Sequence, residues 1–149
     1  MTRFSLDADV LLYAADRAAG ARHDRALEIL DRAVRRDCIL TLQVLAEFFH
    51  VVTRRAMVAR TEAATQLRDW TTEFPTVSAD SGALWTALEL TVDRRVAWWD
   101  ALLLATAERH GCTTVLSEDM PDGARFGRVT ILDPFVGDTL PERVAELLR

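Results

Sequence analysis

Short apolar runs that favour β-strands alternate along this chain with segments of helical periodicity, and this alternation limits the fold more than any other feature. Strands separated by helices pair in parallel, because each helix returns the chain to the same end of the sheet. We therefore expect an α/β fold, a three-layer α/β/α sandwich around a central, mostly parallel sheet. The expected strands are residues 3–6, 38–41, 112–116 and 129–132.

The helical segments are marked by capping residues and helix breakers as well as by apolar periodicity. Thr41 and Thr61 are the expected N-caps of two helices, and Pro75 ends the second of them, because proline cannot continue a helix. Asp80 or Ser81 is expected to open the next helix. Helices are expected at residues 9–17, 23–36, 42–57, 62–74, 81–92, 100–110 and 142–148.

Length and composition fit a single domain, expected to span residues 1–149, without a linker, repeat or low-complexity segment. Half of the residues are hydrophobic (50%), which is enough for a sizeable core. Cys38 and Cys112 each begin an apolar run and are expected to be buried as small hydrophobic residues. Neither cysteine has neighbours at a spacing that suggests zinc.

The charge of the chain limits the classes of function. A net charge of −5 argues against a free-standing, high-affinity nucleic-acid binder, which is usually basic. All 18 basic residues are arginine, which excludes a mechanism that requires lysine. Because no secretory signal peptide and no membrane-spanning segment is evident, we expect a cytoplasmic protein.

Four carboxylates interrupt or end apolar runs: Asp7, Glu47, Asp100 and Asp119. A carboxylate is rarely buried without a partner, because removing its charge from water is costly. Each lies close to the end of an expected strand or in a helix beside one, and sites in parallel sheets lie at the carboxyl ends of strands. All four can therefore meet at one edge of the sheet. Hard oxygen ligands of this kind suit Mg²⁺ or Mn²⁺.

Each carboxylate, taken alone, also has a structural interpretation. Asp7 and Asp100 are both suitable helix N-caps, and Asp119 is a common type of turn residue. Glu47 can pair with either of the arginines at positions 54 and 55. Only the set of four, placed along the chain as described, favours a functional site.

Four sequence blocks carry a resemblance to a known family. The blocks are Asp7-Ala8-Asp9-Val10-Leu11-Leu12-Tyr13-Ala14, Thr41-Leu42-Gln43-Val44-Leu45-Ala46-Glu47-Phe48, Trp99-Asp100-Ala101-Leu102-Leu103-Leu104-Ala105 and Cys112-Thr113-Thr114-Val115-Leu116-Ser117-Glu118-Asp119-Met120, followed by Gly123 and Asp133-Pro134-Phe135. In this order and at these separations, they resemble a PIN domain of the VapC type, the toxin of a bacterial type II toxin–antitoxin pair. The chain departs from the family at Asp9, where asparagine is usual. The aspartate can raise metal affinity beside Asp7, or it can cap the following helix.

The resemblance implies a PIN-like fold and a Mg²⁺- or Mn²⁺-dependent endoribonuclease, a hydrolase that cleaves RNA phosphodiester bonds. It implies Asp7 and Asp100 as direct metal ligands and Asp119 as a ligand directly or through water. Glu47 would orient or deprotonate a water molecule held by the metal. The supporting candidates are Asp9, Thr41, Ser117 and Glu118; for Thr41 and Ser117, capping of a strand end is an equally good role.

The resemblance also implies partners. VapC-like proteins form homodimers and are inhibited by a cognate antitoxin whose C-terminal segment lies in a groove near the site. The residues that bind the RNA substrate are not specified by the sequence. Arginine pairs at positions 35–36, 54–55 and 94–95 can contact phosphates, and one of the adjacent Trp98 and Trp99 can stack on a base or pack against a second subunit.

Two other functions fit parts of the sequence. Asp7-Ala8-Asp9-Val10 also matches the opening motif of haloacid-dehalogenase-type phosphatases, with Asp7 as covalent nucleophile and Asp9 as acid/base. In that superfamily a lysine or arginine generally steadies the phosphoryl group, and Glu47 would have no role. The second alternative is a PIN module that binds a partner or RNA without cutting it, which the intact acidic positions disfavour.

Overall fold

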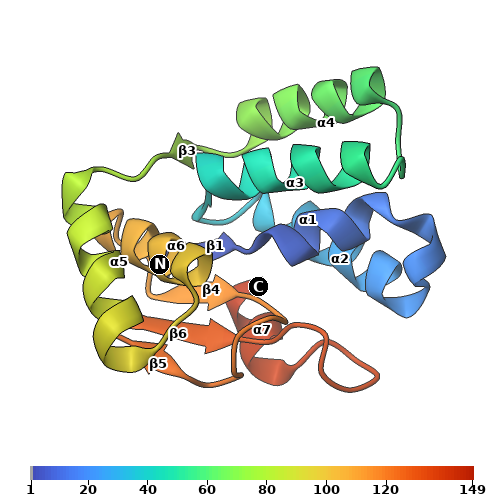
Figure 1. Cartoon of the computed structure of the whole chain (residues 1–149). Helices are drawn as coiled ribbons and strands as arrows, with labels where there is room; N and C mark the ends of the chain where they lie inside the picture. The colour runs from blue at the N-terminus through green and yellow to red at the C-terminus, as the bar shows by residue number, and fades with distance from the viewer. Residues whose placement is uncertain (1) are drawn as a thin grey trace.

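A six-stranded sheet forms the centre of the molecule in the computed structural model, which describes residues 2–149 (Figure 1). The strands lie in the order β3-β2-β1-β4-β6-β5, and all neighbours are parallel except β5 and β6, which are antiparallel. Their bounds are β1 (Phe4–Leu6), β2 (Cys38–Thr41), β3 (Thr76–Val77), β4 (Thr114–Leu116), β5 (Arg125–Phe126) and β6 (Val129–Leu132).

Helices connect the strands and cover both faces of the sheet. They are α1 (Ala8–Ala15), α2 (Ala21–Ala33), α3 (Leu42–Arg54), α4 (Arg60–Glu73), α5 (Ser81–Arg94), α6 (Trp98–Arg109) and α7 (Glu142–Leu147), with a 3₁₀ turn, η1 (Arg17–Ala19), after α1. Because β1, β2 and β3 follow one another in one direction across the sheet, right-handed crossovers place α1–α4 on one face. The return from β3 to β4 places α5 and α6 on the other. The predicted three-layer α/β/α sandwich with a mostly parallel sheet is confirmed.

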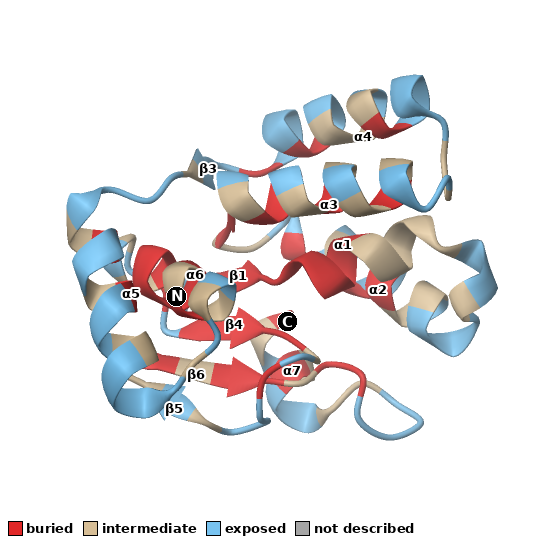
Figure 2. Cartoon of the chain, viewed as in Figure 1, coloured by how far each residue is buried: buried red, intermediate tan, exposed pale blue. Residues whose placement is uncertain are grey.

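The core lies between the sheet and the inner faces of the helices, where Figure 2 shows most of the buried residues. β1, β2 and β4 are buried along their whole length, as expected for central strands covered on both faces. α3 and α4 pack through Phe48 and Trp70, whose rings meet edge to face with 4.8 Å between centroids. Cys38 and Cys112 are buried and free, as predicted. Among residues 2–149, no helix is both long enough and apolar enough to span a bilayer.

The helix caps agree with the sequence at Thr41 and Asp80, as well as at Asp7, and differ from it at Thr61 and Asp100. The Thr41 hydroxyl accepts a hydrogen bond from the Val44 N–H of α3, and the Asp80 carboxylate accepts one from the Ala83 N–H of α5, as predicted. Thr61 is not an N-cap, because α4 already begins at Arg60. Asp100 is not an N-cap either, because α6 begins two residues earlier and places it in the first turn.

Candidate active site

The candidate active site lies at the carboxyl ends of the three central strands β2, β1 and β4. The chain passes from β1 to a neighbour on one side and later to a neighbour on the other, and ligands usually bind where the strand order reverses in this way. Leu6 pairs with Leu116 in the parallel ladder, and the Asp7 N–H donates to the Leu116 carbonyl oxygen at 2.9 Å. Asp7 and Ser117 are therefore neighbours where β1 and β4 end.

Asp7 is a buried carboxylate held by two hydrogen bonds. Its Oδ2 accepts from the Ser117 hydroxyl at 2.7 Å, and its Oδ1 accepts from the Ala8 backbone N–H at 2.7 Å. Asp7 is also the N-cap residue of α1, so its capping role and its place in the site coexist. Burial raises the pKa of Asp7 above its usual value, while both hydrogen bonds lower it. The side chain is thus held in one orientation at the strand end.

Asp9 lies in the first turn of α1, and only one of its two oxygens has a hydrogen-bond donor. Oδ2 accepts from the Glu118 backbone N–H at 2.7 Å. Oδ1 is buried and has no hydrogen-bond partner within residues 2–149. Burial, and then the charge of Asp7, raises the pKa of Asp9 well above its usual value.

Asp119 lies exposed on the loop after β4 and completes a group of three carboxylates. One oxygen each of Asp7, Asp9 and Asp119 lies within 4.8 Å of the other two. Partial burial, and then the charges of Glu118 and Asp133, raises the pKa of Asp119. The Asp119 N–H donates to the Ser117 hydroxyl oxygen at 3.1 Å, so the hydroxyl that holds Asp7 also holds this loop.

Glu47 and Asp100 reach the site from two helices, α3 and α6, and both are half-buried. Burial, and then the charges of Asp7 and Asp119, raises the pKa of Asp100 to about 6. Burial and the charges of Asp7, Asp100 and Asp119 raise the pKa of Glu47 as well. The structure therefore brings all four predicted carboxylates into one electrostatic cluster. Glu47 and Asp100 nevertheless lie outside the 4.8 Å group, to which Asp9 belongs.

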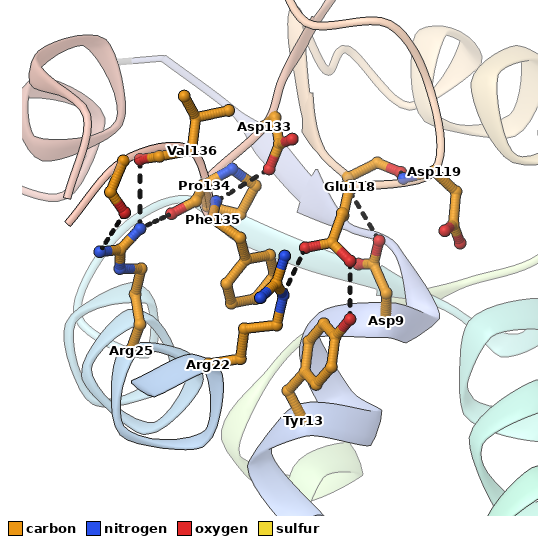
Figure 3. A network of polar contacts seen from close by, with 12 residues as sticks. Asp9, Tyr13, Arg22, Arg25, Glu118, Asp119, Asp133, Pro134, Phe135 and Val136 are labelled. Atoms are coloured by element: carbon orange, nitrogen blue, oxygen red, sulfur yellow. Dashed lines mark hydrogen bonds and ion pairs between the residues drawn. The ribbon is translucent and has the colours of Figure 1, made fainter. Parts of the chain in front are cut away.

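The remaining supporting candidates have different surroundings. Thr41 caps α3 and Ser117 holds Asp7, so both hydroxyls have structural partners. The Glu118 side chain accepts from the Tyr13 hydroxyl at 2.6 Å and from Arg22 Nε at 2.8 Å (Figure 3). Burial, and then the Glu118 hydrogen bond, raises the pKa of Tyr13 to about 12.

The sequence does not single out Tyr13 and Arg22, because their partner lies 105 and 96 positions away along the chain. No local spacing signals such a contact. A hollow of about 200 Å³ lies beside Asp9 and Asp119 and is also lined by Tyr13 and Arg55. Glu47 is not among the ion-paired residues of the part of the chain that is described, which removes its predicted alternative pairing with a neighbouring arginine.

The two adjacent tryptophans have different environments. Trp98 is half-buried against a small cluster formed by α5 and α6, whereas Trp99 is 60% exposed. Their ring centroids are 6.5 Å apart, so the two side chains lie near each other despite this difference in burial. The Trp99 carbonyl oxygen accepts from the Gln43 side chain at 2.9 Å, which ties the start of α6 to α3 next to the site.

The family model of the PIN domain matches residues 5–121, a span that contains the four predicted carboxylates and Asp9. The chain belongs to the PIN domain family. Membership confirms the PIN resemblance and leaves the haloacid-dehalogenase alternative without support. No curated protein matches the sequence significantly.

Solved structures with the PIN fold resemble the chain over most of its length. VapC20 of Mycobacterium tuberculosis, a toxin that cleaves the sarcin–ricin loop, is 20% identical with a TM-score of 0.63, over 78% of this chain and 91% of that one. VapBC2 of Rickettsia felis, bound to a DNA fragment of its promoter, is 12% identical with a TM-score of 0.65, over 87% and 97%. DNA-bound VapBC of Salmonella typhimurium is 14% identical with a TM-score of 0.64, over 88% and 97%. At these identities the likeness shows the fold.

Proposed function

We propose that this PIN domain is a metal-dependent endoribonuclease that acts as the toxin of a toxin–antitoxin pair. The observation that carries the proposal is the group formed by Asp7, Asp9 and Asp119, in which one oxygen of each residue lies within 4.8 Å of the other two. None of the five ion pairs within residues 2–149 supplies a cationic side chain to them. Because like charges held together in a partly buried site destabilise the fold, a divalent cation is the partner that this arrangement fits.

The donor set indicates the kind of ion. Carboxylate oxygens without nitrogen or sulfur ligands favour a hard cation, and Mg²⁺ or Mn²⁺ is our proposal. We assign Asp7 and Asp119 as ligands, with Asp100 as a further one, because its carboxylate interacts electrostatically with both. When bound, such an ion lowers the pKa of water and stabilises the charge that develops on a phosphate under attack.

The residues around these ligands position them and handle protons. Ser117 and the N–H of Ala8 hold the Asp7 carboxylate in place, so that it does not reorganise when substrate arrives. Glu47 is our proposed general base, since burial and neighbouring charges raise the pKa of its carboxyl above the usual value. A carboxylate with a raised pKa accepts a proton from an attacking water molecule more readily.

The toxin assignment rests on the family and on the likeness of the fold to VapC proteins. We propose RNA as the substrate, a cognate antitoxin as inhibitor, a homodimer as the assembly and the cytoplasm as the location. A PIN module that binds RNA without cutting it is the alternative. The retained cluster of Asp7, Glu47, Asp100 and Asp119 argues against that alternative.

Cleavage of an RNA mixture by the purified protein tests the proposal. With Mn²⁺ or Mg²⁺ we expect RNA fragments, and with excess chelator we expect none. A small phosphate ester, incubated in parallel, should stay intact, because its hydrolysis would point to a phosphatase. RNA that is bound but left intact in the presence of either ion would favour the silent module.

A further inference from the structure

Oδ1 of Asp9 is the one oxygen of the Asp7–Asp9–Asp119 group that is buried without a hydrogen-bond partner in the described chain. Asp9 is 8% exposed, so water does not solvate this oxygen freely. The Val10 N–H lies close to the carboxylate, but it donates to the Asp7 carbonyl oxygen at 3.2 Å. A buried oxygen without a donor destabilises the fold unless a ligand supplies the missing interaction.

A network of polar contacts holds the Asp9 side chain in an orientation that leaves Oδ1 without a hydrogen-bond donor (Figure 3). The other Asp9 oxygen, Oδ2, accepts from the Glu118 N–H at 2.7 Å. The Glu118 side chain is held in turn by Tyr13 at 2.6 Å and by Arg22 at 2.8 Å. Glu118 is thus tied to α1 through Tyr13 and to α2 through Arg22. Both helices therefore hold Glu118, whose backbone N–H orients the Asp9 carboxylate.

The separations fit coordination of one ion. Oxygen ligands of Mg²⁺ or Mn²⁺ lie about 2.1 Å from the metal, which puts two ligands on one ion roughly 3 to 4 Å apart. One oxygen of each of Asp7, Asp9 and Asp119 lies within 4.8 Å of the other two, so a small inward movement of the side chains would bring three ligands to that range.

We propose that Asp9 is a direct ligand of the divalent cation through Oδ1, beside Asp7 and Asp119, and that Tyr13 and Arg22 are positioning residues that act through Glu118. The inference rests on the proposed metal-dependent function and adds a carboxylate to its metal site. Asp9 then contributes affinity for the ion through its charge and through one defined oxygen, in contrast to a residue that only caps α1.

Direct binding of Mn²⁺, followed by the EPR signal of the free ion, tests this proposal without measuring cleavage. We expect Asp9→Asn to weaken Mn²⁺ binding by about 10-fold or more, since removing even an indirect partner of a metal site commonly costs 10- to 100-fold in affinity. Tyr13→Phe should weaken binding by a smaller factor, because it loosens Glu118 and leaves the Asp9 carboxylate in place. The metal-induced rise in Tm should shrink in the same order.

Asp133→Asn is the matched control. Asp133 raises the pKa of Asp119 by its charge but lies outside the three-carboxylate group, and an asparagine can still accept from the Phe135 N–H. This change removes one negative charge near the site and keeps the three ligands, so we expect less than about a 3-fold loss of Mn²⁺ affinity. Equal losses for Asp9→Asn and Asp133→Asn would overturn the proposal, because they would reduce Asp9 to a through-space charge.

Two further outcomes separate this inference from the proposed function. If the wild-type protein cleaves RNA in a chelator-sensitive way and Asp9→Asn binds Mn²⁺ as tightly as wild type, the proposed function stands and the Asp9 assignment fails. If wild-type protein binds no Mn²⁺, both fail. The Tm of metal-free Asp9→Asn shows whether the variant is folded, and we expect it to equal or exceed the wild-type value.

Discussion

A single carboxylate of the site can be neutralised at almost constant volume, because asparagine and glutamine have the shapes of aspartate and glutamate. We expect Asp7→Asn, Asp100→Asn and Glu47→Gln each to lower metal-dependent RNA cleavage by about 100-fold or more, since each removes a ligand charge or the proposed base. Initial rates of cleavage in Mn²⁺, with circular dichroism to verify folding, provide the measurement. Asp138→Asn, at an exposed position, is the control and should cleave like wild type. Undiminished cleavage by folded Asp7→Asn and Asp100→Asn would refute the site.

The pKa of Asp100 makes the stability of the metal-free protein depend on pH. The folded protein holds the Asp100 proton up to about pH 6, whereas the ordinary value for an aspartate is 3.8. Between these values the folded state binds more protons than the unfolded chain, so the free energy of unfolding falls as pH rises. Asp7, Glu47 and Asp119 act in the same direction, because their pKa values are also raised.

We therefore predict that the Tm of metal-free protein decreases as the pH rises from about 4 to 7, and that Asp100→Asn reduces this decrease and raises the Tm at neutral pH. Thermal melts in chelator across this range are the measurement. Added Mn²⁺ should restore the Tm of the wild type at neutral pH, since a bound ion offsets the repulsion. A Tm that drops for every neutralised carboxylate would mean that these residues are structural caps or ion-pair partners.

Whether a site residue could be predicted from the sequence depends on whether its signal is local or comes from residues far away along the chain. Asp7, Glu47, Asp100 and Asp119 could be singled out because each interrupts an apolar run, and this is a local signal. The unpartnered oxygen of Asp9 and the support of Glu118 by Tyr13 and Arg22 depend on contacts between α1, α2 and the loop after β4. Such contacts exist only in the folded chain.

Among the elements, the end of α3 shows a conformation that its sequence does not favour. Ala56 follows the helix in a left-handed conformation, with φ of 53°. Its N–H donates to the Thr53 carbonyl oxygen at 3.2 Å, and the Met57 N–H donates to that of Val52 at 2.9 Å, the two bonds of a Schellman motif. Glycine is usual at this position, because a Cβ atom is strained there.

We predict that Ala56→Gly stabilises the protein by about 0.5 to 1 kcal/mol, because glycine adopts this left-handed conformation without strain. Urea unfolding followed by circular dichroism measures the change. Ala64→Gly, inside α4, is the matched control and should destabilise by about 1 kcal/mol, since glycine in a helix interior gains no such relief. A loss of stability for Ala56→Gly would show that the left-handed conformation is not strained in this chain.

The length and composition of each strand and helix explain which of them could be predicted from the sequence. β2 and β6 have the predicted bounds, because each is a run of three apolar residues and one threonine, residue types that favour strands, with turn or helix signals beside it. β3 and β5 are two residues long, and a run of that length has no periodicity to detect. α6 begins at Trp98, where no side chain caps the helix, so no local signal marks its first residue. The helix packs against α5, a contact that the sequence does not reveal.

At the scale of the whole molecule, a groove joins the site. It has a volume of about 550 Å³, lies between the end of α1 and the helices α3 and α4, and is lined by apolar Phe48, Val58 and Ala63 together with charged Arg17 and Glu62. Met57 and Asp16 belong both to this groove and to the hollow beside Asp9 and Asp119. A bound segment can therefore lie in the groove and reach the carboxylates.

The homodimer and the inhibitor both remain predictions. For the inhibitor, the groove indicates where on the protein it would bind. We predict that an antitoxin places a basic side chain on Asp7 and Asp100 and packs apolar residues into the groove, since an acidic site attracts an arginine or lysine in competition with metal. Replacing that basic residue with alanine should restore RNA cleavage by the complex, or weaken inhibition about 100-fold, when cleavage is titrated against the inhibitor.

Val58→Glu should weaken inhibition while the free protein cleaves RNA at the wild-type rate, because Val58 lines the groove and not the hollow. If the inhibitor's basic residues are dispensable and Val58→Glu leaves inhibition intact, the partner binds elsewhere and this model of inhibition is wrong, whether or not the protein is a nuclease.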